Sequence, residues 1–172
     1  ALLEGHFILS SGLHSKQYVQ CAKLLSFPKK AEAICSSLCK KISSTINKID
    51  IVLSPAIGGI VVGYEVGRRL GVETIFAERF EERLILRRGF KIPENSKVLV
   101  VEDVITTGKS ALECSEIVKK NKSEVVGYAC IIDRSNNSVL IKQKIISQIK
   151  FEIETFREKE LPDELKKIIP VK

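Results

Sequence analysis

The sequence predicts an α/β fold in which a central parallel sheet is flanked by helices. Short runs rich in Val and Ile alternate along the chain with segments whose apolar residues recur at helical spacing. The short runs are apolar almost throughout, which is typical of strands buried on both faces. Alternation of such strands with helices is the pattern of a helix-covered parallel sheet. The 172 residues suit a single domain, residues 1–172, with small additions.

The elements of the expected core follow one another in a regular order. The predicted helices are residues 27–46, Gly58–Leu70 and Gly108–Lys120. Their inward positions recur at helical spacing: Ala31, Ile34, Leu38 and Ile42, then Val62, Val66 and Leu70, then Ala111, Leu112, Ile117 and Val118. The predicted core strands are Ile49–Leu53, Glu73–Ala77, Lys97–Val101 and Val125–Ile132. Lys97–Val101 is the clearest buried strand.

Both ends of the chain depart from this alternation. Phe7–Leu9 and Tyr18–Cys21 resemble short strands, and we expect residues 1–25 to contribute to a small hood over the sheet. Arg87–Ile92 resembles half of a hairpin, and a strand at Ile145–Ile153 is followed by a short helix at Pro162–Ile169. Because the chain contains no Met and starts abruptly, we expect some native N-terminal residues to be missing.

Composition favours a soluble cytoplasmic protein that binds neither nucleic acid nor membrane. Lys and Arg exceed Asp and Glu by 28 to 21, but the positive residues are scattered in short pairs. No apolar run approaches the roughly 18 residues of a membrane span. The cysteine count is odd and no Cys-x-x-Cys pair occurs, so we expect buried thiols rather than disulfides or zinc ligands: Cys21, Cys35, Cys39, Cys114 and Cys130.

The stretch Lys97–Ser110 predicts a phosphate-binding turn between a strand and a helix. Ligands of open α/β sheets bind beyond the carboxyl ends of the strands. Thr106, Thr107 and Ser110 supply hydroxyl donors there, and Gly108 allows close approach of the backbone. The free N–H groups and the dipole of the following helix favour a dianion at the same place.

Two carboxylates precede this turn. Glu102 and Asp103 would repel a phosphate, but as hydrogen-bond acceptors they suit the vicinal hydroxyl groups of a ribose. The alternative is that Asp103 caps the helix and Glu102 is merely exposed. A P-loop is excluded, because the first glycine of its pattern would fall at Asp103.

The segment Val100–Ser110 resembles the phosphoribosyl diphosphate motif of type I phosphoribosyltransferases. The resemblance implies that Glu102 and Asp103 are the catalytic acids and bind the ribose hydroxyls. It also implies that the 5-phosphate is bound by the rest of the motif: Val104, Ile105, Thr106, Thr107, Gly108, Lys109 and Ser110.

A second anion site is predicted at Ser54–Ile60, where a strand again leads through a glycine pair into a helix. The alternative is a tight turn with a glycine helix start. In the family this position corresponds to the pyrophosphate loop, so the resemblance assigns Ile57, Gly58 and Gly59 to the pyrophosphate.

The segment Glu4–Ser15 resembles the N-terminal signature of orotate phosphoribosyltransferases, whose hood covers the base. The sequence Leu-Arg-Arg-Gly-Phe at Leu86–Phe90 resembles the segment that precedes the main motif in a bacterial and archaeal subgroup of these enzymes. The resemblance implies orotate contacts at Ser11, Gly12, Thr106 and Arg134. A guanidinium at Arg134 suits a planar carboxylate, although a salt bridge within the loop is the alternative. We expect His6 and His14 to be ordinary hood or surface residues.

The chain departs from the family where basic residues are usual, at Ser10, at Gly58 and in the Arg79–Gly89 loop. Arg79, Arg87 and Arg88 are therefore the expected substitutes, with Arg79 and Arg88 binding phosphoribosyl diphosphate. The resemblance implies that this mobile loop closes over the site and, in a homodimer, reaches the neighbouring site.

The implied reaction converts orotate and phosphoribosyl diphosphate into orotidine 5'-monophosphate and pyrophosphate, in the de novo synthesis of pyrimidine nucleotides (UMP). Mg²⁺ is expected as the cofactor, held mainly through substrate oxygens. A purine or uracil phosphoribosyltransferase, or a non-catalytic regulator on the same fold, is the alternative. The Phe7–Ser15 segment argues against the first of these, and the lack of a clustered basic face or an added helix-turn-helix argues against the second.

Overall fold

A mixed sheet forms the centre of the computed structural model, which describes residues 2–8, 12–135, 139–150 and 153–171. Its strand order is β5-β4-β3-β6-β7-β8. The strands are β3 (Ile51–Pro55), β4 (Glu73–Phe80), β5 (Arg83–Leu86), β6 (Lys97–Ile105), β7 (Glu124–Asp133) and β8 (Ile145–Lys150). All neighbours pair in parallel except β4 and β5. The predicted fold class is confirmed.

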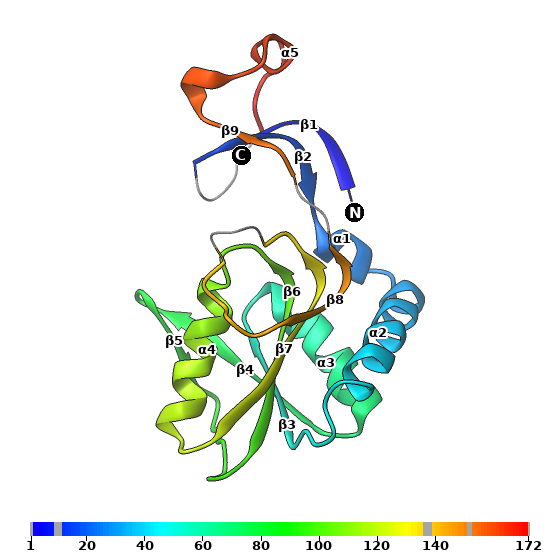
Figure 1. Ribbon diagram of the computed structural model, residues 1–172, viewed down its shortest axis with the longest axis vertical. Helices are drawn as coiled ribbons and strands as arrows, with labels where there is room; N and C mark the ends of the chain where they lie inside the picture. The colour runs from blue at the N-terminus through cyan, green and yellow to red at the C-terminus, as the bar shows by residue number, and fades with distance from the viewer. Residues whose placement is uncertain (1, 9–11, 136–138, 151–152, 172) are drawn as a thin grey trace.

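Helices cover both faces of this sheet (Figure 1). The helices α1 (Cys21–Leu25), α2 (Pro28–Ser43) and α3 (Gly58–Leu70) contribute to one core cluster, and α4 (Lys109–Lys120) contributes to the other. Val52 packs in the first cluster, whereas its neighbours Ile51 and Leu53 pack in the second. Successive side chains of a strand point to opposite faces, so a strand covered on both sides must be apolar throughout.

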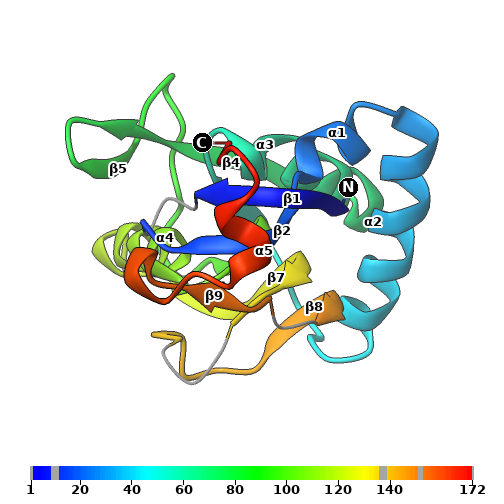
Figure 2. The same ribbon diagram turned by 90° about the horizontal axis from the view of Figure 1, so that it is seen from above.

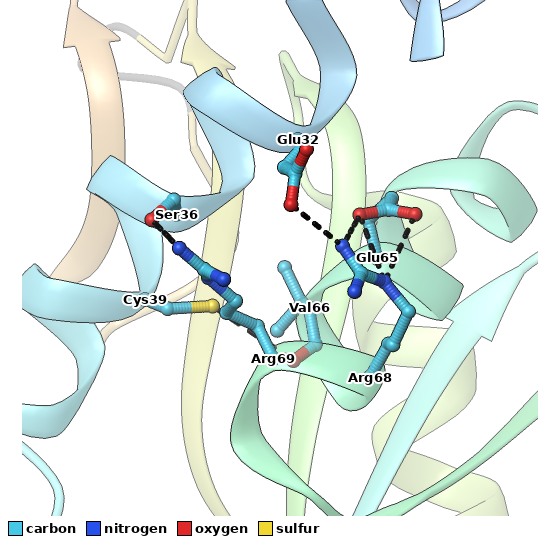
Figure 3. Close-up of polar contacts among 7 residues, drawn as sticks. All are labelled: Glu32, Ser36, Cys39, Glu65, Val66, Arg68 and Arg69. Carbon is cyan, nitrogen blue, oxygen red and sulfur yellow. Dashed lines mark hydrogen bonds and ion pairs between the residues drawn. The ribbon is translucent and has the colours of Figure 1, made fainter. Parts of the chain in front are cut away.

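Polar contacts join α2 to α3 on their solvent side (Figure 3). Arg68 pairs with Glu65 at 2.9 Å and with Glu32 of α2 at 3.4 Å, and Arg69 donates to the hydroxyl group of Ser36. These contacts hold α3 against α2, and the two arginines already have partners there. The sequence predicted α3 with its exact bounds, because Gly71 ends it in the left-handed conformation with φ 71°.

The N-terminal strands differ from the prediction at their ends. β1 is Leu2–Ile8 and β2 is His14–Val19, whereas the predicted strand Tyr18–Cys21 is wrong in its second half. Cys21 begins α1 instead. Cys21 and Leu25 are buried one helical turn apart, so a helix buries both against the same core.

The predicted hairpin strand at Arg87–Ile92 is also wrong. The strand is β5, which pairs antiparallel with β4 across a turn at Glu81-Glu82. Arg88 and Gly89 have φ angles of 57° and 78°, and a strand cannot continue through two left-handed residues. Most of the expected mobile loop is therefore a hairpin, and Leu84 of β5 is buried in the core beside Ala111 and Cys114 of α4.

The hood combines both ends of the chain. β2 pairs with β1 on one side and with β9 (Thr155–Phe156) on the other, and Phe7 forms a bridge with Val171. A 3-10 helix η1 (Glu158–Glu160) and the short helix α5 (Asp163–Lys166) complete it beside β1 and β2 (Figure 2). The helix predicted at Pro162–Ile169 is thus shorter than expected. β8 is Ile145–Lys150, and residues 151–152 of the strand predicted at Ile145–Ile153 lie outside the described residues.

Three further features of the described residues bear on the predictions. All five cysteines are free and buried, as expected. His6 and His14 are buried hood residues, and Nε2 of His6 lies 2.7 Å from Nδ1 of His14. In the described ranges, no helix is long and apolar enough to span a bilayer.

Candidate active site

The candidate site lies where β3 and β6 end, below the hood. These strands are parallel neighbours, so the loops that follow them meet at one edge of the sheet. In Figure 1 the hood lies on the side toward which β6 and β7 run. The structure therefore brings the two predicted anion-binding turns together, although 40 to 50 residues separate them in the chain.

Glu102 and Asp103 lie within β6, because this strand continues to Ile105 instead of ending at Val101. Their side chains point to opposite faces of the strand. The Glu102 carboxylate lies on the side of Cys114 in α4, whereas the Asp103 carboxylate lies against Gly58 at the start of α3. The alternative in which Asp103 caps the next helix is excluded, because α4 has no side-chain cap.

Burial dominates the electrostatics of both acids. It raises the pKa of Glu102 to about 8, with a further contribution from the neighbouring Asp103 charge. Burial also raises the pKa of Asp103, but hydrogen bonds from backbone N–H groups oppose that shift. Burial therefore opposes ionisation of both acids, and for Asp103 the backbone hydrogen bonds partly offset this effect.

The turn after β6 is open to an anion. Thr106 and Thr107 are exposed, and Gly108 is the N-cap of α4 with φ 77°. The first turn of α4 contains no acidic residue and receives no side-chain hydrogen bond from its N-cap, and the Lys109 N–H makes only a long, 3.4 Å hydrogen bond to Thr107 Oγ1. The backbone N–H of Leu140 donates to Thr107 O at 2.9 Å, and a Cβ atom at Gly108 would collide with Ile141. Glycine is thus required at this N-cap.

The loop after β3 has a similar construction. It contains the cis peptide bond Ala56–Ile57, and α3 begins at Gly58 without a side-chain cap or an acidic first turn. A Cβ atom at Gly59 would lie 3.2 Å from Val101 O, so this glycine lets α3 approach β6. The side chain of Ile57 is 85% exposed, so this residue would contact an anion through its backbone.

Arg134 lies at the end of β7, beside the start of the phosphate turn. Its backbone N–H donates to Ile105 O at 2.8 Å. Its buried Nε has no hydrogen-bond partner within the described residues, and burial lowers the pKa of the guanidinium while the nearby Tyr18 raises it. The alternative of a loop salt bridge finds no support in the described part of the chain. A buried, unpaired guanidinium nitrogen is costly, and an anionic ligand would satisfy it.

Of the predicted hood contacts, Gly12 is exposed with φ 80°, and Ser11 lies outside the described residues. Sequence reasoning did not single out Tyr18, which brings the hood strand β2 near Arg134. It also missed Leu140 and Ile141, which lie beside the phosphate turn. No local pattern could have revealed these contacts, because each one joins segments distant in the sequence.

Two of the three predicted arginines pair with carboxylates. Arg79 pairs with Glu113 of α4 at 2.8 Å, and Arg88 pairs with Glu78 at 2.8 Å. The guanidinium of Arg87 lies over the ring of Phe80, 5.7 Å from its centroid. These are contacts within the β4–β5 hairpin and between the hairpin and α4, so a role for Arg79 and Arg88 in ligand binding stays a prediction.

Known proteins resemble this chain over most of its length. Residues 27–160 match the family model described as the phosphoribosyl transferase domain. The orotate phosphoribosyltransferase of Caldicellulosiruptor bescii is 51% identical over 162 residues, which cover 94% of this chain and 84% of that protein. The orotate phosphoribosyltransferase of Methylorubrum extorquens is 47% identical over 173 residues, covering 100% and 88%. This chain belongs to the orotate phosphoribosyltransferase family.

Solved structures show the same fold at lower identity. The orotate phosphoribosyltransferase of Aeropyrum pernix superposes with a TM-score of 0.73 at 22% identity, covering 88% of each chain. An adenine phosphoribosyltransferase of Thermoanaerobacter pseudethanolicus superposes with a TM-score of 0.67 at 19% identity, covering 78% of this chain and 88% of that one. The fold therefore extends across phosphoribosyltransferases that differ in their base. The main sheet therefore does not distinguish one phosphoribosyltransferase from another by its base, and the base must be inferred from other features.

Proposed function

We propose that this chain transfers the 5-phosphoribosyl group from phosphoribosyl diphosphate to orotate, giving orotidine 5'-monophosphate and pyrophosphate. The observation that carries the proposal is that two helix N-termini without side-chain N-caps, at Gly58 and Lys109, follow adjacent parallel strands, with the Asp103 carboxylate against Gly58. Two anion sites flanking an acceptor suit a ribose that carries a phosphate at one end and a diphosphate at the other.

The residues after β6 then divide the sugar phosphate between them. The 5-phosphate occupies the turn from Thr106 to Ser110, with Val104 and Ile105 along its approach, and Lys109 adds a positive charge. Asp103 accepts hydrogen bonds from the ribose hydroxyls and, with Glu102, offsets positive charge that develops on the ring as the C1–O bond breaks. The pyrophosphate leaves against the N–H groups of Ile57, Gly58 and Gly59.

Mg²⁺ fits this site as a cofactor held mainly through substrate oxygens. Within the described residues, no group of three or more His, Cys, Asp or Glu side chains is placed to hold a metal ion by itself. Glu102 and Asp103 supply the carboxylate oxygens that Mg²⁺ accepts alongside phosphate ligands. The bound ion would supply charge neutralisation of the diphosphate.

Arg134 supports orotate as the base. Its unpaired Nε lies in a partly buried guanidinium at the carboxyl end of β7, and a planar carboxylate is the natural partner of that group. In this proposal Thr106, Gly12 and Ser11 also bind the orotate; Ser11 lies outside the described residues. A neutral base such as uracil or adenine would leave the guanidinium unpaired, which argues against a purine or uracil enzyme.

Positioning rather than acid–base chemistry performs most of the reaction in this account. The site holds the orotate ring nitrogen and the ribose C1 in line, and the hood limits the access of water, which would hydrolyse the diphosphate. Arg79 and Arg88 are proposed to neutralise the diphosphate. A guanidinium has five N–H donors, so each can donate to a phosphate oxygen while it stays paired with Glu113 or Glu78.

We further propose a cytoplasmic homodimer in which the segment 79–89 reaches the neighbouring site. An apolar stripe on the outer side of α3 and its preceding loop suits a second copy of the chain: Ile57, Val61 and Tyr64 are 85%, 46% and 61% exposed. The stripe adjoins the pyrophosphate loop, so a partner docked there would lie next to the site.

The proposal is tested by incubating the purified protein with phosphoribosyl diphosphate, Mg²⁺ and one base at a time. We expect turnover with orotate and none with uracil, adenine or guanine. Turnover with another base but not with orotate would contradict the base and leave the phosphoribosyl site standing. Binding of phosphoribosyl diphosphate without turnover of any base would favour the non-catalytic regulator.

A further inference from the structure

Glu113 is the point at which the β4–β5 hairpin is attached to α4. Its Oε2 accepts a hydrogen bond from the guanidinium of Arg79 at 2.8 Å and from the backbone N–H of Leu84 at 3.1 Å. Its Oε1 accepts a second hydrogen bond from Arg79 at 3.3 Å. One carboxylate therefore binds both strands of the hairpin, since Arg79 belongs to β4 and Leu84 to β5.

Arg79 extends the same attachment to the tip of the hairpin. One of its nitrogens also donates to Glu82 O at 2.9 Å, in the turn between the strands. Glu113 is only 23% exposed, and the buried Leu84 packs beside it against α4. This pair is therefore better shielded from solvent than the i,i+3 pair of Glu116 with Lys119, whose side chains are 62% and 68% exposed.

The N-terminal end of α4 directly follows the phosphate turn. Gly108 is the N-cap residue of this helix, and Glu113 lies one turn into it. A rigid helical segment therefore joins Glu113 to the N–H groups that are proposed to bind the anion. β5 is the terminal strand of the sheet and hydrogen-bonds to β4 alone among the strands. Glu113 therefore gives the hairpin a second attachment, on the element that begins at the phosphate turn.

We propose that Glu113 is a positioning residue that couples the hairpin to the phosphate turn and thereby sets the affinity for phosphoribosyl diphosphate. It touches no substrate; it acts through Arg79, Leu84 and α4. The inference rests on the proposed function for the identity of the ligand, but it does not depend on which base is used. Loss of the coupling should weaken phosphoribosyl diphosphate binding and leave the affinity for orotate nearly unchanged.

The test compares Glu113→Gln with Glu116→Gln, a matched control on the exposed side of the same helix. Hydrogen–deuterium exchange of peptides from β5 reports on the attachment, since the Leu84 N–H is one of its donors. We expect exchange about tenfold faster in Glu113→Gln, as for loss of one charge-assisted hydrogen bond, with no change in Glu116→Gln. Glu113→Asp should restore part of the protection.

Affinity is measured in parallel by calorimetry with Mg²⁺ and phosphoribosyl diphosphate in the absence of orotate. We expect about tenfold weaker binding in Glu113→Gln and wild-type binding in Glu116→Gln. Equal exchange in both variants, or faster exchange with unchanged affinity, would overturn the coupling. A wild-type protein that binds the diphosphate but does not consume orotate would contradict the proposed reaction and leave this inference intact. Absence of binding in the wild type would overturn both.

Discussion

The Asp103 carboxylate occupies the space that a side chain at Gly58 would need: a Cβ atom at Gly58 would lie 2.7 Å from Oδ1 of Asp103. The first residue of α3 and the acid in β6 therefore share one small space. This arrangement links the loop proposed to bind pyrophosphate with the acid proposed to bind the ribose, because a side chain added at Gly58 must displace the carboxylate. It also explains why glycine stands at a position where a side chain would otherwise be tolerated.

We predict that Gly58→Ala impairs ligand binding more than folding. The added methyl group must push the Asp103 carboxylate away or shift the loop, while an exposed helix start tolerates alanine well. Affinity for phosphoribosyl diphosphate, measured by calorimetry, should fall by about tenfold or more, equivalent to about 1.4 kcal/mol. The melting temperature should stay near that of the wild type. Wild-type affinity in this variant would show that the loop before α3 and the Asp103 carboxylate do not act together in binding.

Asp103→Asn should lower turnover by orders of magnitude without unfolding the protein. The amide keeps the size of the side chain but removes the charge that stabilises the developing positive ribose ring. Steady-state rates are compared with far-ultraviolet circular dichroism of the same sample. Near wild-type turnover would refute the role assigned to this carboxylate.

Glu102→Gln should stabilise the unliganded protein in a pH-dependent manner. Burial raises the pKa of Glu102 from 4.5 to about 8, so the unfolded state releases this proton at lower pH than the folded state does. The wild type consequently loses stability as the pH rises from about 4.5 to about 8, whereas the neutral glutamine does not.

Thermal unfolding at several pH values measures this difference. Near pH 8 the variant should gain on the order of 4 kcal/mol, or about 8–16 °C. Below pH 4.5 the two proteins should be alike, because Glu102 is then protonated in both states. A constant difference at all pH values would indicate a packing effect and not a titration.

Arg134→Ala should separate the two substrates. The KM for orotate should rise by about a hundredfold, as expected when a charged hydrogen-bonding partner is removed. The KM for phosphoribosyl diphosphate should change by much less, since the 5-phosphate is assigned to backbone groups of α4. Arg134→Lys should recover only part of the loss, because an ammonium cannot reproduce the planar two-donor contact. Equal effects on both substrates would argue for a structural role of the arginine.

Sequence patterns sufficed for the elements whose limits are set locally. The α3 helix ends where Gly71 adopts a left-handed conformation, and the buried strands are apolar on both faces because helices cover both. The turn at Glu81-Glu82 contains none of the usual turn residues, so β5 was placed several residues too late. The end of β6 was also missed, since two carboxylates within a strand resemble the start of a loop.

The remaining features depend on contacts between distant segments. β9 has two residues and is recognisable only through its pairing with β2 about 140 residues earlier. Glu113 looks like any charged residue of an exposed helix until the hairpin is placed against it. The turn between β6 and α4 was predictable because the residues that shape it are consecutive. The arrangement around Arg134 was not, because its neighbours Ile105 and Tyr18 come from two other strands.

The most direct measurement is the spectrophotometric loss of orotate in the presence of phosphoribosyl diphosphate and Mg²⁺. The account predicts steady consumption of orotate that requires both the diphosphate and the ion, with stoichiometric release of pyrophosphate. It also predicts that Asp103→Asn abolishes most of this consumption while the protein remains folded. No consumption of orotate by the folded wild-type protein, with turnover of uracil or a purine base instead, would contradict it.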